Sequence, residues 1–133
     1  MTRYAIDAPT LLHLVSAGIR ADTGHQLVAP SVIRSQALAL LFAAMRAGEL
    51  TDDQALEQHE RLTALKMRLL GDRVSRRTAW RIARDHGWET TYHAEYIAVA
   101  QLQADALVTI DPALASKAQH LVPLAGLDAL IET

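Results

Sequence analysis

The chain has 133 residues, the usual size of one domain, and we expect a single domain over 1–133. Half of its residues are hydrophobic, and 13 basic and 15 acidic side chains give a formal net charge of −2. This balance gives no overall field that favours nucleic acid, so any basic surface must be local. Because the chain has no cysteine, disulfides, thiolate zinc sites and cysteine nucleophiles are excluded.

The first residues, "MTRYAID", lack the apolar core of a signal peptide. No apolar run approaches the roughly 20 residues that span a bilayer. We therefore expect a cytoplasmic protein without a membrane partner.

Short strand-like runs alternate with amphipathic helices along the chain. The predicted strands cover 3–7, 26–30, 66–71, 106–111 and 120–124. The predicted helices cover 9–18, 31–48, 51–65, 73–86, 92–103 and a short stretch from Pro112, before a short helical tail. Strands that alternate with helices pair in parallel through crossover connections. The pattern therefore predicts an α/β fold, a three-layer α/β/α domain with a short, mainly parallel central sheet.

Single residues mark several of the predicted helix boundaries. Pro9 and Pro112 suit the first turns of their helices. The residues "TDDQ" at 51–54 have the form of a capping box. Asp72 is placed to cap the helix that Gly87 ends.

Two aspartates close predicted strands, Asp7 after the first and Asp111 after the fourth. Ligands of open parallel sheets collect at the carboxyl ends of strands. Each aspartate also precedes a helix with proline in its first turn, so simple N-capping is the alternative interpretation. As a pair, they predict a shared carboxylate site for Mg²⁺ or Mn²⁺, completed by water and substrate phosphate.

Two further polar side chains face the predicted interior. Helical phase places His93 on the side of Tyr96 and Ile97, with Glu95 about 160° away on the outward side. Gln36 flanks Ile33 and Leu40 at the edge of the apolar stripe of its helix. His93 and Gln36 are open to two interpretations, hydrogen-bonded structural residues or members of the site.

Four segments resemble, in order and spacing, the PIN-domain family, and within it the VapC-type toxins of bacterial toxin–antitoxin pairs. They are "YAIDAPTLL", "VAPSVIRSQALALL", the basic helix 73–86 and "TYHAEYIAVAQLQADALVTIDPALA". The resemblance covers nearly the whole chain. It implies a PIN-like domain with helices on both faces of the sheet, and an acidic cluster that binds Mg²⁺ or Mn²⁺ and hydrolyses RNA.

Carried over position by position, the resemblance implies a catalytic set of Asp7, Gln36, His93 and Asp111. Asp7 and Asp111 match two of the family's acidic residues and are the implied metal ligands. Gln36 stands at the acidic position of "RSExL", and His93 at that of "YDAxY". Each missing charge weakens metal binding by on the order of a few kcal/mol, although one or two carboxylates suffice for some Mg²⁺ sites. We therefore expect weak metal binding, with His93 orienting water or carrying a proton.

Eight of the thirteen basic residues lie between Arg61 and Glu89, with only three acidic ones. On the helix 73–86, Arg73, Arg77, Trp80 and Arg84 fall within about 60° of one another. This face predicts RNA binding, because an aromatic ring among arginines stacks a base beside phosphate contacts. The alternatives are a solvated helix face and a docking surface for an acidic antitoxin segment.

The leading hypothesis is a VapC-like endoribonuclease with an atypical acidic site, whose partners are RNA, a small antitoxin protein and a second copy in a homodimer. The alternative is a degenerate PIN domain that binds RNA or protein without cleavage. A third possibility is an α/β domain of similar architecture only, in which Asp7 and Asp111 are helix caps that do not converge in space.

Overall fold

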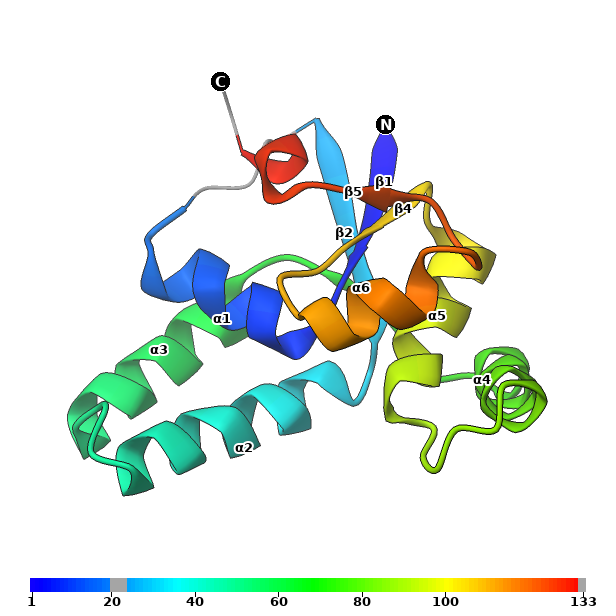
Figure 1. Cartoon of the computed structure of the whole chain (residues 1–133). Coiled ribbons are helices and arrows are strands. Elements are labelled where there is room, and N and C mark those ends of the chain that lie inside the picture. Colours follow the sequence, from blue (N-terminus) through cyan, green and yellow to red (C-terminus); the bar gives the residue numbers. More distant parts are fainter. Residues whose placement is uncertain (20–23, 132–133) are drawn as a thin grey trace.

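The computed structural model describes residues 1–19 and 24–131, and within them five strands form one all-parallel sheet (Figure 1). The strands are β1 (Thr2–Ile6), β2 (His25–Pro30), β3 (Arg68–Leu70), β4 (Ala106–Val108) and β5 (Leu124–Ala125). Their order is β3-β2-β1-β4-β5, so β1 lies in the centre and pairs with both β2 and β4. Parallel neighbours place the carboxyl ends of β1 and β4 at the same edge of the sheet.

Six α-helices and one 3₁₀-helix complete the described part of the chain. They are α1 (Ala8–Ser16), α2 (Ile33–Arg46), α3 (Asp52–Ala64), α4 (Arg73–Asp85), α5 (Tyr92–Gln103), α6 (Pro112–Ala118) and the 3₁₀-helix η1 (Leu127–Leu130). Helix α5 packs on β1 and β2 with α4 beyond it, while α1 packs against α2 and α3 (Figure 1). The predicted three-layer α/β/α fold is confirmed. None of the described helices has the length and apolar character needed to cross a membrane.

The residues predicted to begin and end helices do so in the structure. Thr51 and Gln54 form a reciprocal capping box at the start of α3. The carboxylate of Asp72 accepts a hydrogen bond from the Ser75 amide at 2.9 Å and caps α4. Gly87 follows α4 with a φ of 68°. This backbone conformation is unfavourable for any residue that has a side chain, so glycine suits the position.

Three details differ from the prediction. The strand predicted over 106–111 stops at Val108, because the next amides leave the ladder: the Ile110 amide donates instead to the hydroxyl of Thr10. The strand predicted over 120–124 is reduced to Leu124–Ala125, since β5 pairs with only the last two residues of β4. Leu40, predicted in an apolar stripe, is 38% exposed. Residues 132–133 of the predicted tail lie outside the described residues.

Helix α5 is buried on almost all sides, because the sheet covers one face and α4 another. Residues 96–100 are all buried, and Tyr96 and Ile97 have no exposed surface. Small residues such as Ala94 and Ala98 allow the close approach of neighbouring elements. This packing sets the first turn of α5 beside the carboxyl ends of β1 and β4.

Candidate functional site

Asp7 is a buried carboxylate at the end of the central strand. Its side chain is 2% exposed. One carboxylate oxygen, Oδ1, accepts hydrogen bonds from the Thr10 amide at 3.3 Å and from the Thr10 hydroxyl. The other, Oδ2, accepts from the hydroxyl of Thr109 at 2.7 Å. Asp7 therefore caps α1, as the alternative interpretation predicted, and is also tied to the turn after β4; these donors offset the cost of its burial.

Two threonine hydroxyls connect the ends of β1 and β4. The hydroxyl oxygen of Thr10 accepts from the Ile110 amide, and that of Thr109 accepts from the Asp111 amide, each at 3.0 Å. Because the Thr109 oxygen contacts both partners, Asp7 Oδ2 lies within about 6 Å of the Asp111 backbone nitrogen. The carboxylate of Asp7 and the backbone of Asp111 therefore meet at one edge of the sheet, although each aspartate also caps a helix.

Asp111 faces an imidazole and, beyond it, an ammonium. Its Oδ1 accepts from the Ala113 amide at 2.9 Å and caps α6, while its Oδ2 lies 3.5 Å from His93 Nε2. Lys117 Nζ lies 3.0 Å from His93 Nδ1 and 5.1 Å from the centre of the Trp88 ring. An ammonium can only donate, so Nδ1 is the acceptor and Nε2 carries the hydrogen that faces Asp111. The imidazole of His93 thus lies between the ammonium of Lys117 and the carboxylate of Asp111.

Gln36 reaches the site through a tyrosine. The hydroxyl of Tyr96 donates a hydrogen bond to Gln36 Oε1. Burial first, and then the neighbouring Tyr92, Asp7 and Glu95, raise the pKa of Tyr96 far above its ordinary value. Tyr96 is therefore a neutral donor at all working pH values, and Gln36 supplies an amide oxygen to it.

Tyr92 lies in the field of both aspartates. Burial first, and then the charges of Asp7 and Asp111, raise the pKa of its hydroxyl. The phenol of Tyr92 is therefore near enough to Asp7 and to Asp111 to be affected by the charge of each.

Tyr96→Phe is expected to lower the free energy of unfolding by about 1–2 kcal/mol, because Gln36 loses its buried partner. Urea unfolding measures this loss. The matched control is Tyr92→Phe, because Tyr92 is 38% exposed. This substitution should change the free energy of unfolding by less than about 0.5 kcal/mol. Equal stabilities of Tyr96→Phe and the unmodified chain would contradict the assigned hydrogen bond.

The donor set of this site suits a divalent ion only in part. Within residues 1–19 and 24–131, no group of three His, Cys, Asp or Glu side chains is placed to hold a metal ion. Asp7 and Asp111 fit Mg²⁺ or Mn²⁺ in sites where waters and substrate phosphates supply most of the ligands. The Lys117 ammonium, next to His93, opposes a second positive charge nearby.

The basic face of α4 is an open groove. The groove has a volume of about 830 Å³ and is lined by Arg73, Arg76, Arg77, Trp80 and Arg81. Trp80 is 65% exposed, so most of its indole ring is open to solvent. The structure thus brings together three residues of the predicted set, Arg73, Arg77 and Trp80.

The fourth residue of the predicted set lies beyond Trp80. Arg84 lines a neighbouring pocket with Trp80 and Trp88, and its guanidinium contacts Asp85 at 3.1 Å. Thr78 and Ile82 are buried on the opposite side of α4, whereas Val74 is 57% exposed.

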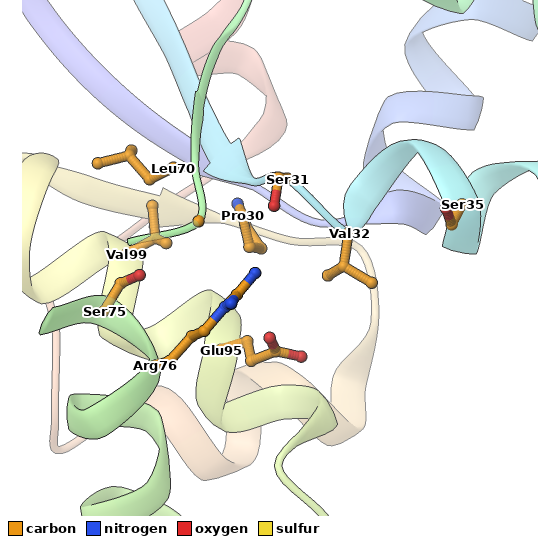
Figure 2. A pocket seen from close by; sticks show the side chains of 10 residues that line it. Pro30, Ser31, Val32, Ser35, Leu70, Ser75, Arg76, Glu95 and Val99 are labelled. Carbon is orange, nitrogen blue, oxygen red and sulfur yellow. The ribbon is translucent and has the colours of Figure 1, made fainter. Parts of the chain in front are cut away.

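A smaller pocket, of about 340 Å³, opens beside the carboxyl ends of β2 and β3 (Figure 2). Arg76 and Glu95 both line it. Helical periodicity correctly placed Glu95 on the opposite side of α5 from His93. It predicted that Glu95 faces solvent, whereas Glu95 lines a pocket that α4 closes on one side. The sequence carried no signal for this pocket, because it depends on where α4 docks.

No protein-family model matches this chain, and no curated protein matches it. Among solved structures, the crystal structure of PAE2754 from Pyrobaculum aerophilum is similar, with a TM-score of 0.71 and 20% sequence identity. The match covers 96% of this chain and 92% of that one. At this identity the likeness shows a shared fold and carries no activity with it.

Proposed function

We propose that this chain is a VapC-like PIN-domain ribonuclease that hydrolyses RNA with Mg²⁺ or Mn²⁺ at the site of Asp7 and Asp111. The observation that carries this proposal is the hydroxyl of Thr109, which donates to the carboxylate of Asp7 and accepts from the backbone amide of Asp111. They come from neighbouring parallel strands at the edge of the sheet where ligands of such folds collect.

Each side chain of the site has a role in this reaction. Asp7 and Asp111 would hold the ion, which when bound supplies a more acidic water and charge for the phosphoryl oxygens. Thr10 and Thr109 orient the carboxylate of Asp7 through their hydroxyls. His93 presents its Nε2 hydrogen beside Asp111, where it orients a water or a phosphoryl oxygen.

The test is cleavage of a 5′-labelled single-stranded RNA by the purified chain, with Mn²⁺, with Mg²⁺ and with excess EDTA. Cleavage that needs the ion supports the proposal. Binding of the RNA without cleavage under any ion contradicts it.

We assign RNA binding to the groove of α4. Four arginines surround an exposed indole there, and none of the four forms an ion pair within the described part of the chain. Arginines without carboxylate partners are available to phosphates, while Trp80 offers a flat surface to a base.

Trp80→Ala is expected to weaken binding of single-stranded RNA about tenfold, because one base loses its stacking partner. Fluorescence anisotropy in 0.1 M salt measures the effect. Trp80 is 65% exposed, so the substitution should leave the melting temperature almost unchanged. The matched control is Leu56→Ala on α3, also exposed, which should bind RNA as the unmodified chain does. Unchanged affinity of Trp80→Ala would remove this groove from the RNA path.

A second function, a degenerate PIN domain that binds RNA or protein without cleavage, is favoured by one observation. The Lys117 ammonium contacts His93, which in turn faces Asp111. Its positive charge therefore lies where the nuclease would need a divalent ion. In that case the same groove holds RNA or an acidic antitoxin segment. A small antitoxin, a homodimer and a cytoplasmic location remain predictions.

A further inference from the structure

The pocket beside the carboxyl ends of β2 and β3 is separate from the aspartate site (Figure 2). It lies on the far side of α5, because Glu95 is about 160° from His93 around the helix. Five elements and the loops that flank them contribute to its lining residues: Pro30, Ser31, Val32, Ser35, Leu70, Gly71, Ser75, Arg76, Glu95 and Val99. We propose that this pocket binds an unpaired guanine base; that the base belongs to RNA rests on the function proposed above.

Two opposite charges enter the pocket without neutralising each other. Figure 2 shows Arg76 reaching in from α4 and Glu95 from α5. Within residues 1–19 and 24–131, neither side chain has a salt-bridge or side-chain hydrogen-bond partner. An unpaired guanidinium and an unpaired carboxylate in one pocket offer strong donors and strong acceptors to the same ligand.

Guanine matches this arrangement better than the other bases. Its edge carries two adjacent N–H donor groups, N1 and N2, which one carboxylate accepts together. The acceptors O6 and N7 lie on the adjoining Hoogsteen edge and pair with a guanidinium that approaches from that side. Adenine and cytosine offer a carboxylate only one amino group, and a free phosphate is repelled by Glu95.

The walls and the position of the pocket fit a single base. Pro30, Val32, Leu70 and Val99 provide apolar surface for the faces of a ring, and the serines provide small polar groups. Its volume of about 340 Å³ is at the small end of ligand pockets. Arg76 lines both this pocket and the groove of α4, so the two adjoin at that side chain. An RNA strand that follows α4 can therefore turn one base into the pocket.

The experiment compares GMP, AMP, CMP and UMP as ligands of the purified full chain by equilibrium dialysis. The basic groove attracts the phosphate of all four equally, so the ratio between nucleotides reports the base. We expect GMP to bind about tenfold more tightly than AMP. Glu95→Gln should remove this preference, while Glu60→Gln on α3 should keep it. Equal binding of the four nucleotides, or a GMP preference that survives Glu95→Gln, overturns the proposal.

Two further outcomes separate this proposal from the ribonuclease. GMP preference in a chain that cleaves no RNA supports the base pocket and refutes the nuclease. Inorganic phosphate that competes fully with GMP, and binds more tightly to Glu95→Gln, marks an anion site and overturns the guanine assignment.

Discussion

Asp111→Asn is expected to lower Mn²⁺-dependent RNA cleavage about a hundredfold while the protein stays folded. The substitution removes one of two negative charges from the proposed ion site. It keeps the cap of α6, because an asparagine side-chain oxygen accepts from the Ala113 amide as the aspartate does. The measurement is the initial rate of RNA cleavage at an Mn²⁺ concentration that half-saturates the unmodified chain, with thermal unfolding followed in parallel.

The matched control for this variant is Asp53→Asn, an exposed carboxylate in the first turn of α3. It changes the net charge equally but lies outside the site, so its cleavage rate should equal that of the unmodified chain. If Asp111→Asn also cleaves RNA at the rate of the unmodified chain, the reaction takes place at another site or comes from a contaminating nuclease.

Asp7→Asn should lower cleavage at least as much as Asp111→Asn does, but with a cost in stability of about 1–3 kcal/mol. Asp7 accepts from the hydroxyls of Thr10 and Thr109, and both hydroxyl oxygens already accept from backbone amides. An asparagine NH₂ group would face one of these hydroxyls as a second donor. Asp111→Asn is therefore the cleaner test of chemistry.

Lys117→Met is expected to increase the affinity for Mn²⁺ about tenfold, because it removes a positive charge that stands close to the carboxylates. The ammonium lies 3.0 Å from one imidazole nitrogen of His93, and the other nitrogen lies 3.5 Å from Asp111. The direct repulsion of a divalent ion at roughly 8 Å is about 4 kcal/mol at an effective dielectric near 20, and salt screening reduces it.

The electron paramagnetic resonance signal of free Mn²⁺ measures this binding without reference to catalysis. Lys66→Met is the matched control, since Lys66 is the other lysine of the chain and is exposed. It should leave the affinity unchanged. A weaker affinity in Lys117→Met would mean that the lysine supports the ion site, and an unchanged one that its charge does not reach it.

The helices and strands were predictable because their signals lie within a few neighbouring residues. The capping box of Thr51 and Gln54 and the cap of Asp72 need only three residues of chain, and both form as expected. The alternation of strands with helices likewise leads to a parallel sheet through the geometry of crossover connections. For the same reason Asp7 and Asp111 could be named in advance, since both follow strands in such a sheet.

The chemistry around those aspartates depended on contacts between distant residues. Asp7 and Thr109 are 102 positions apart, and the lysine that faces His93 follows it by 24. Glu95 was expected in solvent, and only the docking of α4 against α5 makes it a pocket residue. The sequence alone determined the elements and the edge where polar residues gather, because these follow from local periodicity and capping. The tertiary structure alone decided which cation, hydroxyl and carboxylate meet, because side-chain partners depend on how separate elements pack in space.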